Sequence, residues 1–80
     1  MKLPRDLSGA QLAKALARIG YNVTRQTGSH MRLTTSDGGE HHVTIPAHDS
    51  LRIGTLAGIL GDVAEHLSLT RDELARRLFG

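Results

Sequence analysis

The sequence contains neither cysteine nor tryptophan, and its 80 residues include one tyrosine, one phenylalanine and two prolines. Without cysteine, disulfide bonds, thiolate nucleophiles and cysteine-ligated zinc sites are excluded. Because Tyr21 and Phe79 are the only aromatic residues, we do not expect a platform on which the bases of a single strand stack. The composition therefore argues against a disulfide scaffold and against a cysteine enzyme.

Long hydrophobic runs are also missing. The apolar stretches are far shorter than the ~20 residues that a membrane helix needs. The N-terminal segment MKLPRDLSGAQ lacks the apolar run that follows the basic residues of a signal peptide. We therefore expect no membrane segment and no signal peptide, and the absence of cysteine is compatible with a cytoplasmic setting. The length predicts one domain, residues 1–80.

Acidic residues are scarce in the first half of the chain, and basic residues are the minority in the second half. Residues 1–35 carry six basic residues against one acidic residue, a net charge of +5, and residues 36–80 carry four basic against seven acidic residues, a net charge of −3. A basic half suits a phosphate backbone, whereas an ordinary solvated surface is the alternative interpretation.

A capping box predicts the first helix. Ser8 and Gln11 form an S-x-x-Q pattern in which each residue satisfies a backbone N–H of the other. Gly20 is placed to take the left-handed conformation that ends a helix. We therefore predict an amphipathic helix over residues 8–19, and its apolar face is formed by Leu12, Leu16 and Ile19.

Three alternating segments, residues 21–26, 29–35 and 41–46, predict an antiparallel meander, with SDGG at 36–39 as the second turn. The alternation assigns one set of side chains to the core: Tyr21, Val23, Met31, Leu33, Val43 and Ile45. The other face then carries a polar set: Asn22, Thr24, His30, Arg32, His42 and Thr44.

The first hairpin needs an extra residue if the two faces are to match. A two-residue turn at 27–28 would place Val23 opposite Arg32, on the wrong side of the sheet. A three-residue loop in which Gly28 adopts a left-handed bulge conformation returns Val23 to the apolar side. We interpret Gly28 and Ser29 as turn residues, and Ser29 as no nucleophile, because no carboxylate-oriented base accompanies it.

Two helices are predicted after the strands. Thr55 is a candidate N-cap for a helix that directs Leu56, Ile59, Leu60 and Val63 to the core. Thr70 and Glu73 form a second capping box that opens a short C-terminal helix. The order α-β-β-β-α plus a terminal helix predicts an α+β fold with the helices on one face of the sheet.

Five histidines invite a metal-site interpretation, which the spacing does not support. His41 and His42 are neighbours on a strand and point to opposite faces, and no zinc motif is present. We therefore expect no metal. His66, at the end of the second helix, is expected to interact with the helix dipole or with solvent.

His30 differs because it points outward, follows a glycine turn and precedes Arg32 by two residues on the same face. Imidazole is the side chain best suited to acid–base chemistry near neutral pH. If the third strand pairs as its apolar residues indicate, its exit through Pro46 and His48 lies near His30. The alternative is an exposed histidine with no function.

The run LSGAQLAKALARIGYNVTRQTGSHMRLTT…HHVTIPAHDSLRIGTLAGIL resembles the HicA (YcfA-like) toxins of HicA/HicB toxin–antitoxin pairs, up to about Leu69. The resemblance rests on four motifs in this order: the helix ending at Gly20-Tyr21, the turn and strand Gly28-Ser29-His30, the strand Val43-Thr44-Ile45-Pro46 with His48, and the helix start Gly54-Thr55-Leu56. The second helix carries Asp62 and Glu65 where many members of the family have basic residues.

The resemblance implies a fold similar to a double-stranded RNA-binding domain, with two helices on a three-stranded sheet. It further implies a small cytoplasmic endoribonuclease, or mRNA interferase, that inhibits translation by cleaving mRNA without a metal or other cofactor. The histidine of the G-S-H motif, His30, would be the catalytic group. A HicB-type antitoxin would bind the toxin and mask this histidine.

Combining the motif with the chemistry of RNA cleavage, we assign proton transfer to His30 and charge neutralisation to Arg32. Further phosphate contacts are expected from Lys2, Arg25, His48 and the helix start at Thr55. Two alternatives stay open. One is a non-catalytic RNA-binding module of the same fold, and the other is a protein-interaction domain without a nucleic-acid role.

Overall fold

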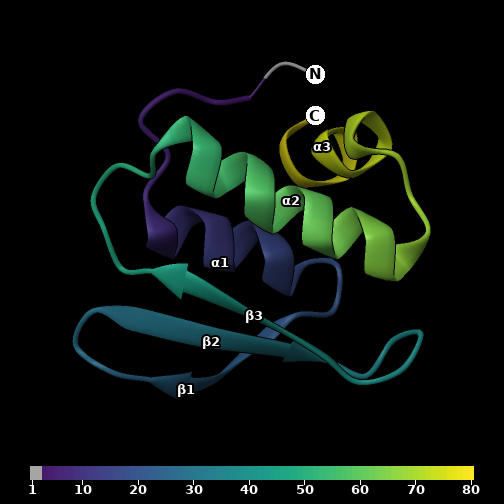
Figure 1. Ribbon diagram of the computed structural model, residues 1–80, viewed down its shortest axis with the longest axis horizontal. Coiled ribbons are helices and arrows are strands. Elements are labelled where there is room, and N and C mark those ends of the chain that lie inside the picture. The colour runs from purple at the N-terminus through teal and green to yellow at the C-terminus, as the bar shows by residue number, and fades with distance from the viewer. Residues whose placement is uncertain (1–2) are drawn as a thin grey trace.

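A computed structural model describes residues 3–80 and places three helices on one side of a three-stranded sheet (Figure 1). The elements are α1 (Gly9–Ala17), β1 (Asn22–Gln26), β2 (His30–Thr35), β3 (His41–Pro46), α2 (Ile53–Leu67) and α3 (Arg71–Phe79). The sheet is antiparallel with strand order β1-β2-β3. This arrangement confirms the predicted α+β class and is consistent with the fold of a double-stranded RNA-binding domain.

The predicted capping box of α1 and the predicted left-handed Gly20 are confirmed, but the helix ends at Ala17 and not at residue 19. Ser8 caps the helix, with its hydroxyl accepting from the Gln11 N–H at 3.0 Å, and the Gln11 carboxamide oxygen accepts from the Ser8 N–H at 2.9 Å. At the other end Gly20 has φ +103°, and the Tyr21 N–H donates to the Leu16 carbonyl at 3.1 Å. These bonds form a Schellman motif, whose tightened last turn shortens the regular helix to residues 9–17.

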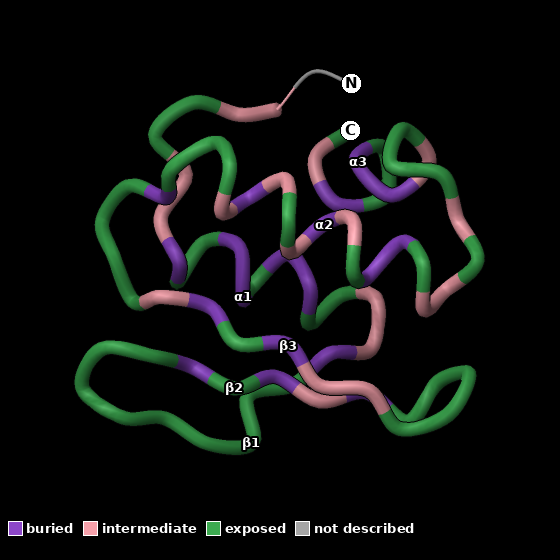
Figure 2. The backbone as a smooth tube through the Cα atoms, viewed as in Figure 1, coloured by how far each residue is buried: buried purple, intermediate pink, exposed green. Residues whose placement is uncertain are grey.

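The strands pair in the predicted register, with Met31 opposite Ile45 and Leu33 opposite Val43. These four side chains and Tyr21 are buried against the helices, as expected. The prediction that Val23 belongs to the core is wrong, because this side chain is 47% exposed. Although Val23 pairs with Leu33, β1 is an edge strand whose five residues are all exposed, so the helical layer leaves it uncovered (Figure 2).

The first hairpin does not close with the predicted three-residue loop: Gln26 lies opposite Met31 and the Thr27 N–H donates to the His30 carbonyl, so residues 28–29 form the turn and the extra residue is elsewhere. Gly28 does not have a positive φ, so its predicted left-handed conformation is wrong; Gly38 and Gly39 in the second hairpin do have one. The register instead shifts between Val23 and Arg25, and Arg25 lies opposite Arg32. A β-bulge at residue 24 therefore places Val23 opposite Leu33, which is the role that we expected Gly28 to have.

The start of α2 differs from the prediction at Thr55. The helix begins at Ile53 with Arg52 as its N-cap residue, and no side chain caps it. Leu51 is buried and its N–H donates to the Leu7 carbonyl at 2.8 Å, which fixes the chain in place two residues before the helix. Thr55 thus lies within the first turn and is not a cap.

The predicted capping box of α3 is confirmed. The Glu73 N–H donates to the Thr70 hydroxyl at 3.1 Å, and the Thr70 N–H donates to the Glu73 carboxylate at 3.0 Å. The bond from the Thr70 backbone N–H is the main cause that lowers the pKa of Glu73.

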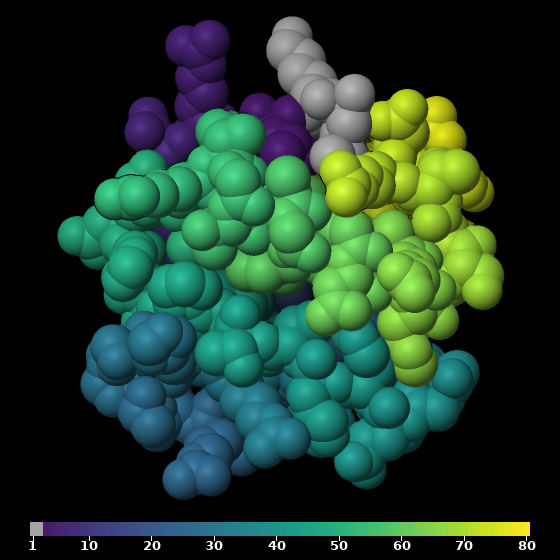
Figure 3. Space-filling model, in the orientation of Figure 1, coloured from purple at the N-terminus to yellow at the C-terminus, as the bar shows by residue number. Residues whose placement is uncertain are grey.

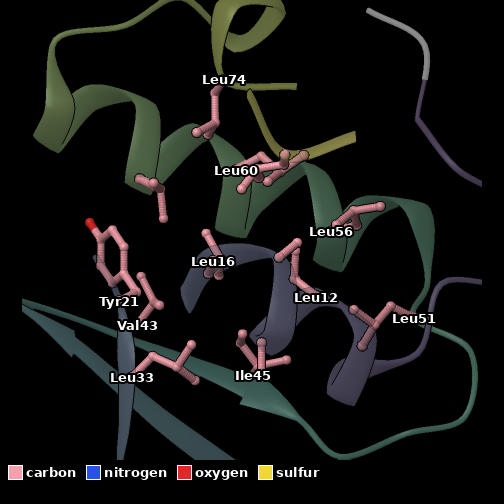
Figure 4. Close-up of a cluster of buried hydrophobic side chains, with 14 of the residues drawn as sticks. Leu12, Leu16, Tyr21, Leu33, Val43, Ile45, Leu51, Leu56, Leu60 and Leu74 are labelled. Atoms are coloured by element: carbon pink, nitrogen blue, oxygen red, sulfur yellow. The ribbon is translucent and has the colours of Figure 1, made fainter. Parts of the chain in front are cut away.

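The core joins all the layers (Figure 4). Its largest fully buried side chains are Tyr21, Leu12, Leu16, Leu33, Ile45, Leu56, Leu60, Leu74, Leu78 and Val63. Removing one such leucine side chain from water stabilises the fold by about 1.5–3 kcal/mol. The predicted core positions of α2, Leu56, Leu60 and Val63, are among them, and Ile59 is half-buried against the same cluster.

A close backbone approach joins the start of α1 to the end of β3. The Gly9 N–H donates to the His48 carbonyl at 2.9 Å. A Cβ atom added at Gly9 would collide with the Pro46 carbonyl oxygen, so no larger residue fits without movement. The first turn of α1 thereby holds the chain that leaves the sheet.

Candidate active site on the open face of the sheet

One face of the sheet is left free by the helices, and we call it the open face. Its side chains come from all three strands: Asn22, Thr24, Arg25, His30, Arg32, Thr34, His42, Thr44 and Pro46. Each of these residues is exposed or half-buried. In the space-filling view the β1 and β2 segments, in blue, form the margin of the molecule that is farthest from the helices (Figure 3). The predicted outward set is therefore confirmed, and Arg25 joins it.

His30 combines an exposed side chain with a fixed backbone. It lies opposite Pro46 at the end of the sheet, and its carbonyl accepts from the Thr27 N–H at 2.9 Å. The Ala47 N–H donates to the Ser29 carbonyl at 2.8 Å, so the exit of β3 lies beside His30 as predicted. Its Nδ1 atom lies 3.0 Å from the Ser29 hydroxyl, while Nε2 has no hydrogen-bond partner within residues 3–80. The outer ring nitrogen is therefore available for proton transfer.

The bulge brings two arginines together next to His30. Simple alternation would direct Arg25 to the helical side, but the register shift places it opposite Arg32. Thr24 also points to the open face, where its hydroxyl lies 2.8 Å from that of Thr34. Like charges directly opposite on a sheet repel. Neither arginine forms an ion pair with any residue between 3 and 80, so this part of the open face suits an anion.

The far end of the open face holds a histidine in different surroundings. His42 contacts the Thr34 hydroxyl through Nδ1 at 2.7 Å and the Glu40 carboxylate through Nε2 at 3.0 Å. With the contact between Thr24 and Thr34, these bonds form a line across all three strands. Both ring nitrogens of His42 are thus engaged, in contrast to those of His30.

A second histidine cluster lies between the sheet and α2. The Tyr21 hydroxyl contacts His41 Nδ1 at 2.8 Å, and His41 Nε2 contacts the Asp62 carboxylate at 3.1 Å. Burial, with a smaller contribution from Asp62, raises the pKa of Tyr21 to about 12. The phenol therefore stays protonated at neutral pH. Sequence reasoning missed this network, which depends on the packing of α2 over the hairpin.

His66, in the last turn of α2, belongs to the same cluster and makes contacts beyond the predicted interaction with the helix dipole or solvent. Its ring stacks on that of His41, with centroids 4.3 Å apart and planes 9° from parallel. Its Nε2 contacts the carbonyls of Asp37 at 2.9 Å and Gly39 at 3.1 Å. The cluster fastens the second hairpin to α2. In the part of the chain that the structure describes, no three or more side chains are arranged to hold a metal ion.

The remaining predicted site residues are spread over the molecule. His48 is exposed two residues after Pro46, whereas Thr55 is half-buried in the helical layer. Gly28 is exposed in the first hairpin loop, and a Cβ added there would meet no atom within 4 Å. Lys2 lies outside the described residues. None of the helices within residues 3–80 has the length and apolar character to cross a membrane.

A comparison with known protein families agrees with the resemblance seen in the sequence. No curated protein and no solved structure gave a match. The profile of a family described as "HicA toxin of bacterial toxin-antitoxin" matches residues 9–64. The match spans α1, the whole sheet and most of α2, and it includes His30 and both arginines of the open face, while α3 lies beyond it. The chain therefore belongs to the HicA family of bacterial toxins, whose members act in pairs with an antitoxin.

Proposed function

We propose that this toxin is an endoribonuclease that cleaves mRNA in the cytoplasm and so inhibits translation, with His30 as its acid–base residue. The observation that carries the proposal is the pairing of an exposed imidazole, whose Nε2 has no partner within residues 3–80, with two arginines that are not in ion pairs there. Membership of a toxin family supports it, because destroying mRNA stops growth.

The chemistry needs few groups because RNA carries its own nucleophile. His30 Nε2 would accept the proton of a 2′-OH, whose oxygen then bonds to the adjacent phosphorus as the bond to the 5′-oxygen breaks. The 5′-oxygen takes up a proton from the imidazolium or from water. A general base contributes about 10²–10⁴-fold to the rate of such a step. The products are a 2′,3′-cyclic phosphate and a 5′-hydroxyl end.

The arginines would stabilise the negative charge that develops on the phosphate. Arg32 follows His30 by two residues on one face of β2, a spacing of about 6.6–6.8 Å along the strand. Long guanidinium side chains reach a phosphate held beside the imidazole, and charge-assisted hydrogen bonds to it are strong. Arg25, directly opposite Arg32, adds a second cation.

More distant contacts extend the proposed RNA site. His48 leaves the sheet beside His30, and Lys2 adds a further cation near the N-terminus. The first turn of α2, which contains Thr55, starts without a side-chain cap, and N–H groups at such a helix start attract phosphate.

A HicB-type antitoxin would neutralise the toxin by covering the open face. A partner that presents acidic side chains to Arg25 and Arg32 would complement their charge and also deny RNA access to His30.

The test is cleavage of a long, unstructured RNA by purified protein in EDTA, with His30→Ala alongside. We expect wild type to leave 2′,3′-cyclic phosphate ends and His30→Ala to lose at least about 100-fold in rate. His42→Ala is the matched control, since it lies on the same face with both ring nitrogens engaged, and it should retain cleavage. If RNA is bound but not cut by wild type, the protein is instead a non-catalytic RNA-binding module.

A further inference from the structure

Ser29 is placed against the ring of His30 by a backbone that is held on both sides. The Ser29 carbonyl accepts from the Ala47 N–H at 2.8 Å, and the His30 carbonyl accepts from the Thr27 N–H at 2.9 Å. The Thr27 hydroxyl adds a longer contact of 3.4 Å to the same His30 carbonyl. With these two peptide units fixed between the loop and β3, the Ser29 hydroxyl lies 3.0 Å from His30 Nδ1.

This contact bears on which nitrogen of His30 carries the proton. A neutral imidazole has one N–H, so Nε2 can accept a proton only when the hydrogen is on Nδ1. The tautomer of a histidine is set by the hydrogen bond that its other nitrogen makes. The Ser29 oxygen can accept a bond from Nδ1–H, which leaves the lone pair on the outward Nε2. The same bond persists after Nε2 is protonated.

The partner of His30 also differs in charge from the partners of the other strand histidines. His41 and His42 contact the carboxylates of Asp62 and Glu40, whereas the one partner of the His30 ring among residues 3–80 is a hydroxyl. A carboxylate beside His30 would offset part of the positive charge that Arg32 offers to a phosphate. A hydroxyl orients the ring without that cost in electrostatic attraction.

We infer that Ser29 is a positioning residue, which holds His30 in the Nδ1–H tautomer and aims Nε2 at the substrate; the inference rests on the proposed ribonuclease function. Ser29 does not itself take up the proton or attack the phosphorus. The turn role that the sequence predicts for Ser29 is thus joined to a second role in the reaction.

The experiment compares wild type, Ser29→Ala and Ser29→Thr, the last of which keeps the hydroxyl. The tautomer of His30 is measured by long-range ¹H–¹⁵N NMR on the free protein, and kcat and KM are measured on a short RNA. We expect Ser29→Ala to lower the Nδ1–H fraction and to lower kcat about three- to tenfold with KM unchanged, as for the loss of one hydrogen bond. Ser29→Thr should restore both values.

The two readouts separate the possible failures. A Ser29→Ala protein with wild-type tautomer populations overturns the inference, and so does one with an altered tautomer but unchanged kcat. If wild type does not cleave RNA at all, the proposed function fails, and the NMR measurement still decides whether Ser29 orients the ring. Since Ser29 is exposed and has a negative φ, Ser29→Ala is expected to fold.

Discussion

Histidines occupy both ends of the sheet, and their surroundings differ at each end. At the second hairpin, both ring nitrogens of His41 are in hydrogen bonds, and its ring stacks on His66. At the first hairpin, the exposed His30 ring has one hydrogen bond to the described part of the chain, through Nδ1. Figure 1 shows why: α2 ends over the second hairpin, whereas no helix covers the open face.

The contrast between His41 and His30 shows how one residue type serves two purposes in a small fold. A polar group that packing has fully satisfied contributes to stability, and its removal leaves buried partners unpaired. A group whose bonding capacity is left open contributes little to stability and is available to a ligand. By this criterion His41 is structural and His30 is available for chemistry.

The largest expected effect comes from replacing each of these histidines in turn. His30→Ala should lower RNA cleavage by about 10²–10⁴-fold while changing the free energy of unfolding by less than about 0.5 kcal/mol. His41→Ala should leave the chemistry of the folded protein intact but destabilise it by about 1–3 kcal/mol, because the buried Tyr21 hydroxyl loses its partner. Urea unfolding and cleavage assays on both variants measure the two quantities.

The same pair of variants can contradict the comparison. If His41→Ala abolishes cleavage at a temperature where the variant is folded, then the second cluster takes part in the reaction. If His30→Ala unfolds the protein, then the exposed histidine has a structural role that its single contact does not explain.

The second effect concerns the two glycines nearest the His30 end. Gly9→Ala should destabilise the fold by about 1–3 kcal/mol, since its Cβ would collide with the Pro46 carbonyl and push the β3 exit away from His30. Gly28→Ala is the matched control and should be close to neutral, as nothing lies within 4 Å of its Cβ and its φ is not positive. Thermal unfolding distinguishes them; a destabilised Gly28→Ala would show that the loop has a conformational demand of its own.

Local patterns in the sequence were sufficient to predict most of the fold. The two capping boxes at Ser8 and Thr70, the turn glycines of the second hairpin and the strict alternation along β2 each depend on residues close in sequence. Such signals act within one segment of the chain and do not depend on tertiary packing. The order of elements and the outward direction of His30 followed from them.

The errors all depend on contacts between distant segments. Val23 has a core pattern, but whether an edge strand is covered depends on the reach of the helices. Thr55 is a good cap residue, yet the anchoring of Leu51 to Leu7 starts α2 earlier. The sequence showed that the first hairpin needs an extra residue. Alternation alone did not show that this extra residue is Thr24. The bulge at Thr24 directs Arg25 to the open face.

Stability at high pH tests the second histidine cluster. The folded-state pKa of Tyr21 is about 12, above its ordinary value of 10, so folding favours the neutral phenol. The stability that this provides is complete below pH 10 and is lost as the pH rises from 10 to 12. Tyr21→Phe, which cannot ionise, is the control. The difference in unfolding free energy between the two proteins should shrink or reverse over this range, whereas a constant difference would contradict the raised pKa of Tyr21.

The smallest effect on stability, and the sharpest on binding, is expected from the arginine pair. Arg25→Ala and Arg32→Ala each remove one of two opposed like charges that have no ion-pair partner within residues 3–80, so neither should lower the melting temperature. Each should weaken RNA binding and lower the slope of log K against log salt by about 0.7, the value for one phosphate contact on a single strand. Arg71→Ala, on the helical side, serves as the control and should leave that slope unchanged. An unchanged slope in both open-face variants would place the RNA on another surface, and the contrast between the two ends of the sheet would then describe stability alone.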